Sequence, residues 1–559
     1  MWLINRFEPD SAAYNMPLIV RLSGKLNAQA LAMAVHDVLD RHESLRTKFP
    51  DSANGPRQQI VPTRDINVDM QVQTVTEANI VERITSLVTA GFDVTAQVPL
   101  RSALYQLTPD EHVLAIVVHH IIGDGESMTP MARDVMLAYA ARSAGEAPAW
   151  DPLEIQYADF AIWQREALGD INDPNSVASE QLDYWKKTLA GLPDLLDLPT
   201  DRPRPAYAGM EAGVASFAIS EESHSALMKL GSEQGSSLFM VLHAIFAATL
   251  SRITGTTDIP IGSPVAGRGE EQVDDLIGMF VNTLVLRTDV QPDDTFSAFL
   301  NQVRRVDLEA FEHADIPFEQ LVEALSPRRT TAHAPLTQVV ISLQNPQQGK
   351  LELPGLTIAP FEGAVESAKF DVLLTLEQKF SDEQVPAGIT ASLVYRTDIF
   401  DESTMLRLGR RFSRVIDAVT DNPDIIIGDI DIVDEQEASS IVQGGSKPTS
   451  AASGDTAIMD GLPAVTPETL AQILARGAES NPTGTAIVGA EKNVNFMNLD
   501  KRSSRLARLL IAHGAAPETS VAIALPVSTE MVVAIWPSPR QVRQLNCSAS
   551  IHQRPPAHR

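Results

Sequence analysis

The stretch EHVLAIVVHHIIGDG, residues 111–125, constrains the fold of this chain more than any other segment. Its six consecutive apolar residues, Val113 to Val118, are typical of a strand that is covered on both faces. The strand ends in His119 and His120, which interior packing alone does not explain. The pattern indicates an α/β lobe with a functional turn at the tip of an inner strand.

The two histidines cannot both serve one site, because neighbouring side chains of a strand point to opposite faces. We expect one ring to face a cavity and the other to be hydrogen-bonded within the fold. Diverging rings also disfavour a metal site, which needs converging ligands. A neutral imidazole, with an unperturbed pKa of about 6.5, suits the removal of a proton from a nucleophile near pH 7. The chain contains no GxSxG motif, so direct acyl transfer without a covalent enzyme intermediate is favoured.

The same residues also fit a simpler interpretation, in which the histidines make ordinary hydrogen bonds at a strand end and Asp-Gly forms an ordinary turn. The arrangement of Gly123 and Gly125 on either side of Asp124 argues against this interpretation. Both positions lack a side chain where a substrate could approach the backbone. If Asp124 is buried, it requires a cation or hydrogen-bond donors.

Composition bounds the class of protein. Among 559 residues, 72 acids against 44 bases give a formal charge of −28, which disfavours nucleic acid and anionic membranes as partners. No stretch approaches the roughly 18 to 20 apolar residues that cross a bilayer, and the N-terminus lacks a signal-peptide pattern. We therefore predict a cytoplasmic protein. The single cysteine, Cys547, excludes internal disulfides and CxxC metal sites.

Hydrophobic periodicity predicts a sequence of elements on both sides of this motif. Asn27 can cap a helix with Leu31, Val35, Val38 and Leu39 on one stripe. Helices are also expected at SMTPMARDVMLAYAA and SSLFMVLHAIFAATLSRI, and strands at DIPIGSPV, MFVNTLVLRTDV, LTQVVISLQN and AKFDVLLTLEQ. Residues 436–463 are rich in Ser, Gly and Ala without periodicity, which predicts a flexible linker before an α/β segment at 464–535.

Six motifs in order carry a family resemblance. HHIIGDG resembles the HHxxxDG signature of the condensation domains of nonribosomal peptide synthetases. RHESLRTKF, YADFAIW, GSPVAGR, IGMFVNTLVLR and HADIPFE resemble further motifs of that family, over residues 1 to about 435. The resemblance implies two lobes similar to chloramphenicol acetyltransferase, forming a V-shaped pseudo-dimer with a tunnel between them. The lobes would be residues 1–160 and 161–435. Upstream donor and downstream acceptor carrier proteins would supply substrates on phosphopantetheine arms, with no cofactor bound covalently to this chain.

The resemblance also implies roles for individual residues. His120 would be the catalytic histidine, acting as a base or positioning the amine. The backbone N–H of Gly125 would be a donor to the oxyanion. His119 and Asp124 would be structural, with Asp124 paired with Arg41 or, as a weaker alternative, Arg46. Asn282 and Trp185 are candidate tunnel-lining residues, and core packing is the default for Trp185.

Other motif residues are expected to be structural. Tyr157, Phe160 and Trp163 are interpreted as lobe-packing core. His313 and Asp315 are interpreted as part of a helix start with Pro317. The histidine pair and the RHESLRTKF and LDLPTDRPRP stretches resemble the class that joins an L-configured donor to an L-configured acceptor. Glu126 departs from the tryptophan that relatives often carry there.

Both ends of the chain depart from the family pattern. The first strand is expected to be missing before Met1. Residues 464–535 resemble the beginning of an adenylation domain, without the Gly, Ser and Thr-rich phosphate loop, so amino-acid activation is not expected. The tail 536–559 is interpreted as a disordered, frameshifted sequence, because one codon choice for PRQVRQ reads KAGAA in another frame. Resequencing that finds no alternate frame would refute this hypothesis.

Two other functions stay open. One is a coenzyme A-dependent acyltransferase of the same fold, which shares HxxxDG and usually works as a trimer with one lobe per chain. The other is an inactive, truncated fragment that only docks carrier proteins.

Overall fold

The computed structural model describes residues 1–433, except 8–9, 54, 67, 69, 210, 328–329, 345–351, 354, 362–367 and 382. It also describes residue 437 and residues 476–535, except 489–492, 514–524 and 526–527. The chain divides into two compact units, Met1–Gln443 and Gly444–Arg559. The expected linker, apart from residue 437, and the expected tail lie outside the described residues.

The first sheet contains six strands in the order β11-β12-β1-β6-β5-β4. These strands are β1 (Asn15–Gly24), β4 (Val72–Thr74), β5 (Leu100–Thr108), β6 (Glu111–His119), β11 (Glu352–Leu353) and β12 (Leu356–Pro360). All neighbours are antiparallel except the β4 and β5 pair. The apolar run of the opening motif is therefore an inner strand, as its composition predicted.

The side chains of β6 divide between two layers of core. Leu114, Ile116 and Val118 face α2 (Ala28–Arg41) and α4 (Met128–Ser143), whereas Val113, Ala115 and Val117 face α3 (Ile80–Thr89). Burial on both faces explains why apolar and polar residues do not alternate along this strand. The cap of α2 forms as predicted, because the Asn27 side chain accepts a hydrogen bond from the N–H of Ala30 at 3.1 Å.

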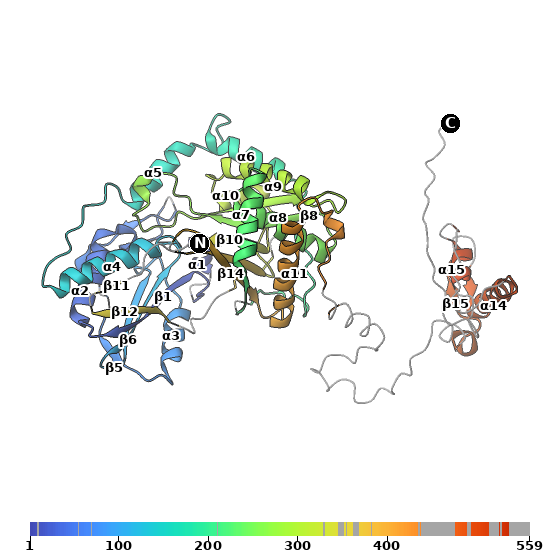
Figure 1. The fold of residues 1–559 in the computed structure, drawn as a ribbon, viewed down its shortest axis with the longest axis horizontal. Coiled ribbons are helices and arrows are strands. Elements are labelled where there is room, and N and C mark those ends of the chain that lie inside the picture. Colours follow the sequence, from blue (N-terminus) through green and yellow to red (C-terminus); the bar gives the residue numbers. More distant parts are fainter. Residues whose placement is uncertain are drawn as a thin grey trace. The chain divides into compact units, whose positions relative to one another are not determined.

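Several short elements complete the first lobe. They are α1 (Trp2–Phe7), the paired strands β2 (Thr47–Lys48) and β3 (Gln59–Ile60), and the 3-10 turns η1 (Glu43–Arg46) and η2 (Thr63–Asp65). After them, α5 (Tyr157–Leu168) and α6 (Val177–Thr188) lead to the second lobe. Figure 1 shows these two helices between the blue and the green parts of the chain.

The second sheet also has six strands, in the order β7-β14-β13-β10-β8-β9. They are β7 (Ala212–Ile219), β8 (Asp258–Val265), β9 (Asn282–Asp289), β10 (Val339–Gln344), β13 (Val372–Phe380) and β14 (Pro386–Arg396). Four of these strands, β8, β9, β10 and β13, were predicted from the sequence. Each lobe thus has one mixed sheet and its own helices, which is the architecture expected from the family resemblance.

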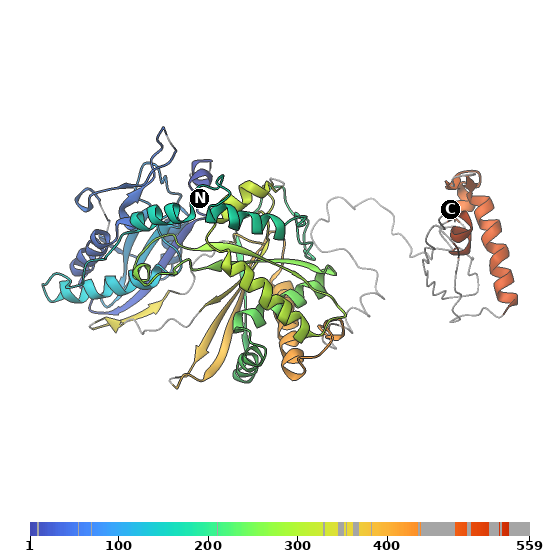
Figure 2. The ribbon, with the colours of Figure 1, turned by 90° about the horizontal axis from the view of Figure 1, so that it is seen from above.

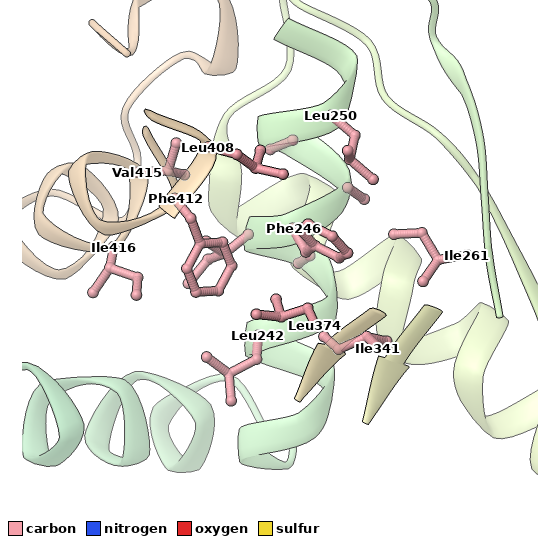
Figure 3. Packing of buried hydrophobic residues seen from close by; sticks show 14 of the residues in the cluster. Leu242, Phe246, Leu250, Ile261, Ile341, Leu374, Leu408, Phe412, Val415 and Ile416 are labelled. Atoms are coloured by element: carbon pink, nitrogen blue, oxygen red, sulfur yellow. The ribbon is translucent and has the colours of Figure 1, made fainter. Parts of the chain in front are cut away.

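Helix α8 (Leu238–Thr254) forms the centre of the second core. It is apolar nearly all round because α7 (Glu221–Glu233), α9 (Phe296–Glu312), α11 (Glu402–Asp421) and the sheet surround it. Figure 3 shows Phe246 of α8 between Phe412 of α11 and the strand residues Leu374 and Ile341. Burial of each such side chain stabilises the fold by about 1.5–3 kcal/mol. The remaining elements here are α10 (Phe318–Leu325), η3 (Glu271–Val273) and η4 (Ile427–Asp429).

One segment crosses between the lobes and corrects the predicted lobe boundary. Strand β12 belongs by sequence to the expected second lobe, 161–435, but pairs with β1 of the first sheet from Val20 to Gly24. Figures 1 and 2 both show this yellow strand beside the blue strands. No single cut in the sequence therefore separates the lobes. The sequence did not reveal this crossing, because β12 is short and only one of its residues is buried.

The C-terminal unit is small within its described residues. Strands β15 (Thr485–Ile487) and β16 (Val494–Asn495) pair, and α14 (Phe496–Ala512) and α15 (Thr529–Ile535) pack through Leu499 and Val533. Among the described helices of the whole chain, none alone is long and apolar enough to cross a membrane. Helices α7 and α8 are long and apolar enough only when they are taken together, and the pair is bent by 104°.

Candidate active site

His119 is the buried member of the histidine pair. Its side chain is 1% exposed, and its Nδ1 accepts a hydrogen bond from the N–H of Ile121 at 3.0 Å. The ring packs against Tyr14 and Phe92, with centroids 5.9 and 6.3 Å away. Burial, with smaller effects of neighbouring positive groups, lowers the pKa of His119 to about 4. This geometry fits a neutral structural histidine, as expected from the alternation of a strand.

His120 lies on the turn after β6 and remains partly exposed. Its backbone N–H donates to the carbonyl of Tyr14 at 2.8 Å. Its Nδ1 is buried and makes no hydrogen bond with the described residues. Burial first, and the charge of Lys369 second, lower the pKa of His120 to about 4. The ring is therefore neutral at pH 7.

The two glycines of the motif differ in their surroundings. A Cβ built on Gly125 would meet nothing within 4 Å, whereas one on Gly123 would make ordinary contacts with Ser127, Ile277 and Met128. Packing thus does not require glycine at position 125. Within the described part of the chain, the N–H of Gly125 donates to no protein acceptor. That donor is free for another molecule.

Asp124 holds the turn in place through five hydrogen bonds. Its Oδ1 accepts from the N–H and hydroxyl of Ser127, at 2.9 and 2.6 Å, and from Nη2 of Arg268 at 3.3 Å. Its Oδ2 accepts from the N–H groups of Phe280 and Val281, at 2.9 and 3.2 Å. The side chain is 1% exposed, so these donors replace water completely. Asp124 is structural, and it joins the histidine turn to segments more than 140 residues away.

The predicted partners of Asp124 are wrong. Nε of Arg41 pairs instead with Asp134 at 2.9 Å, and the same carboxylate contacts the ring of His42. Arg46 donates to backbone carbonyls and pairs with Glu43 at 3.3 Å. The observed partner, Arg268, was not among the candidates, because it comes from the other lobe and spacing along the chain does not show that contact. Its motif, GSPVAGR, was the one sequence signal that pointed to this arginine.

Asn282 and Trp185 both have structural contacts. The amide nitrogen of Asn282 donates to the carbonyls of Ala314 and Ile316, at 2.7 and 2.8 Å, and its oxygen accepts from Phe318 at 3.0 Å. The indole of Trp185 is 1% exposed. Trp185 is therefore a core residue, because it is too buried to line a tunnel. Asn282 holds the start of α10 in place through its three hydrogen bonds.

The HADIPFE segment begins α10, as interpreted from the sequence. The side chain of Gln181 bonds the backbone of Asp315 at 3.0 Å, and Pro317 is the N-cap of the helix. The ring of His313 stacks on Tyr184, with centroids 3.8 Å apart. These residues are structural.

The aromatic residues of YADFAIW differ in burial. Tyr157 and Phe160 pack on the ring of Phe280, with centroids 5.2 and 4.8 Å apart, and the hydroxyl of Tyr157 donates to the carbonyl of Met279. Trp163 is 51% exposed, so its assignment to the core was wrong. It borders a cavity of about 410 Å³ that His120 does not line.

Lys369 is a neighbour of the histidines that the sequence reasoning missed. Its ammonium lies 5.1 Å from the ring centroid of Tyr14, and its charge lowers the pKa of both His119 and His120. It lies in the segment AKFDVLLTLEQ, which was interpreted only as a strand. Among the described residues, no group of three His, Cys, Asp or Glu side chains could hold a metal ion. The groups described at or near the histidine turn include the imidazole of His120, the backbone N–H of Gly125 and the ammonium of Lys369.

Comparison with known proteins gives consistent matches. The family model described as "Condensation domain" matches residues 1–442, and that of "AMP-binding enzyme" matches residues 474–537. A "Dimodular nonribosomal peptide synthase" of Bacillus subtilis is 40% identical over 96% of this chain and 22% of its own length. An "Isonitrile lipopeptide synthase" of Mycobacterium tuberculosis is 36% identical over 96% of this chain and 21% of its own length. The chain thus spans about a fifth of the length of these relatives.

Two solved structures illustrate the similarity of fold. The X-domain in a complex with OxyB from teicoplanin biosynthesis has a TM-score of 0.72 and 32% identity, covering 78% of this chain and 94% of that one. A four-domain nonribosomal peptide synthetase bound to AMP and glycine has a TM-score of 0.69 at 23% identity, over 96% of this chain and 40% of that one. The second likeness concerns the fold alone.

Proposed function

Because the chain belongs to the condensation-domain family of nonribosomal peptide synthetases, an amide-forming acyltransferase family, we propose that it joins two thioester-bound substrates by an amide bond. The α-amine of an acceptor aminoacyl thioester attacks the carbonyl of a donor aminoacyl or peptidyl thioester. Phosphopantetheine arms of an upstream and a downstream carrier domain present the two substrates. Both substrates are of the L-configured class, and the chain acts in the cytoplasm.

The observation that carries this proposal is the state of His120. The residue is partly exposed, its imidazole is neutral at pH 7, and its backbone is fixed after an inner strand by the bond from its N–H to the carbonyl of Tyr14. A neutral imidazole can accept a proton, whereas a protonated one cannot. Asp124 anchors the following turn, so the ring has a defined place at the junction of the lobes.

The reaction needs no covalent enzyme intermediate. As the amine nitrogen bonds to the carbonyl carbon, the carbonyl oxygen gains negative charge and the nitrogen becomes acidic. His120 accepts that proton or orients the amine while it is lost. Collapse of the intermediate restores the carbonyl, breaks the carbon–sulfur bond and returns a proton to the thiolate. The free N–H of Gly125 is a candidate donor to the oxygen in the intermediate.

The experiment is a mass measurement of the acceptor carrier protein after incubation with a loaded donor carrier and the full chain. We expect dipeptide on the acceptor for the parent and for His36→Ala, because His36 is an exposed histidine on α2. We expect a reaction at least about 100-fold slower for His120→Ala, since about 100-fold is the lower end of the usual contribution of a proton-transfer group. Equal yields from His120→Ala and the parent would refute the proposal.

The same assay separates two alternative functions. A coenzyme A-dependent acyltransferase would accept an acyl-coenzyme A in place of the loaded donor carrier. The presence of two complete sheets in one chain makes this alternative less favoured, because such enzymes usually have one lobe per chain. A docking domain without activity would bind carrier proteins and form no amide with either donor.

A further inference from the structure

Ser127 follows the histidine turn and begins helix α4, a position at which a serine side chain usually caps its own helix. Here the side chain makes no capping hydrogen bond to α4. The residue is 0% exposed, so its hydroxyl finds its partners inside the protein and not in water. The hydroxyl of Ser127 is therefore committed to groups outside the helix that it begins.

That hydroxyl joins the histidine turn to the second lobe. On the side of the turn, Oγ lies 2.6 Å from Oδ1 of Asp124 and accepts from the N–H of the same residue at 3.2 Å. On the side of the second lobe, Oγ lies 2.9 Å from the carbonyl oxygen of Gly278 and accepts from its N–H at 3.1 Å. Nη2 of Arg268 is a further donor, at 3.2 Å. Both backbone groups of one residue of the other lobe thus reach a single oxygen atom.

These contacts use the full bonding capacity of a hydroxyl. A hydroxyl has one proton to donate and two lone pairs with which to accept. The proton goes to Asp124 or to the carbonyl of Gly278, and three N–H donors share the two lone pairs. Within the part of the chain that the structure describes, the backbone groups of Gly278 bond to nothing else. Removal of the hydroxyl would leave both groups unpaired in the interior, which favours a shift of the turn or of the segment around Gly278.

Close packing limits how far the segment around Gly278 can move. A Cβ on Gly278 would lie 2.1 Å from the ring of Tyr157, so this backbone is already in close contact with the ring. The histidine turn also rests on the same segment, because a Cβ on Gly123 would lie 3.7 Å from Cβ of Ser127 and 3.8 Å from Cγ2 of Ile277. The turn is therefore held against a firmly packed surface of the second lobe, and Ser127 is a polar link between them.

We propose that Ser127 is a positioning residue for amide formation, whose hydroxyl sets the place of the turn that carries His120 and Gly125 relative to the second lobe. This inference rests on the proposed amide-forming function. The imidazole of His120 and the N–H of Gly125 belong to the same turn, so a shift of the turn displaces both. Ser127 contacts no reacting atom in this role, and it acts through the groups that it holds. A displacement of about 1 Å in a reacting group slows a reaction about 100-fold.

Single-turnover kinetics in the carrier-to-carrier assay test this role. Ser127→Ala should lower the rate constant at saturating acceptor carrier about 10- to 100-fold, and the acceptor concentration for half the maximal rate should change by less than about twofold. The second expectation follows because the buried Ser127 lies outside any docking surface. Ser44→Ala is the matched control and should equal the parent, because Ser44 is also buried and its hydroxyl bonds to no described residue.

Expressing the rate constant per folded molecule separates positioning from stability. Thermal melting gives the folded fraction of each variant at the assay temperature. If Ser127 only stabilised the fold, the melting temperature of Ser127→Ala would fall while each folded molecule kept the rate constant of the parent. Ser127→Cys keeps a side chain at this site with a weaker donor and acceptor, so its rate constant should lie between those of Ser127→Ala and the parent. It takes the place of Ser127→Ala if that variant does not fold.

The double variant Ser127→Ala with Gly278→Ala tests whether the serine acts through the second lobe. Both changes disturb one contact, so their effects on the rate should be less than additive. Additive losses, or a rate constant per folded Ser127→Ala molecule within about twofold of an active parent, would overturn this inference alone. A parent that forms no dipeptide would overturn the proposed function and this inference with it.

Discussion

Asp124 and Arg268 meet at the junction of the two lobes, with 3.3 Å between Oδ1 and Nη2, although 144 residues separate them in the chain. The guanidinium also donates to the carbonyls of Val273 and Leu276 and lies over the ring of Phe280, 4.1 Å from its centroid. The motif that carries the histidines is thus tied to two motifs of the second lobe. Several motifs that are distant in sequence form one contiguous structure.

Removing the charge of Asp124 should destabilise this junction. In Asp124→Asn the guanidinium of Arg268 loses its carboxylate while only 8% of its side chain is exposed. We expect a loss of about 3 kcal/mol or more in the free energy of unfolding, as for other broken buried pairs. Urea unfolding measures this change. Asp274→Asn, at an exposed carboxylate in the neighbouring turn, should stay within about 0.5 kcal/mol of the parent.

A methyl group at Gly278 should disturb the same junction sterically. A Cβ there would lie 2.1 Å from the Tyr157 ring and 2.8 Å from that of Phe280, so both contacts must be relieved by a shift of the rings or of the backbone. We expect Gly278→Ala to cost about 1–3 kcal/mol, the usual range for overpacking, and to slow amide formation. Gly269→Ala is the matched control, because its Cβ would meet nothing within 4 Å. Equal melting temperatures for the two variants would contradict this account.

The stability of the chain should fall as the pH is lowered from about 6.5 to about 4. The pKa of His119 is about 4 in the folded state and about 6.5 in an unfolded chain, so the unfolded state binds more protons in this window. Burial lowers the pKa of His42, His112 and His224 as well, which adds to the same trend.

Urea unfolding at pH 7.5, 6.0 and 5.0 measures this dependence. His119→Gln should show a shallower decline than the parent, because one of the depressed groups is gone. His36→Gln, at an exposed histidine, should follow the parent. If the parent and His119→Gln decline in parallel, the proton uptake does not come from His119.

The sequence determined the features that depend on local pattern. The six apolar residues of β6 required cover on both faces, and the structure places them between two helical layers. Asn27 caps α2, and the apolar stripe of that helix, with Leu31 and Val38, is buried. His119 is buried and His120 is partly exposed, which agrees with the difference expected for neighbouring positions at a strand end. These features depend on neighbours a few residues apart, which the sequence displays directly.

Only the tertiary structure decided which distant groups meet. Arg41 and Arg46 were nearer in sequence, yet the carboxylate of Asp124 is paired with Arg268, because β8 and the loop after it bring that side chain across the junction. The place of β12 in the first sheet and of Lys369 beside Tyr14 were decided in the same way. A buried charge selects its partner by desolvation and geometry in three dimensions, and neither quantity is encoded by spacing along the chain.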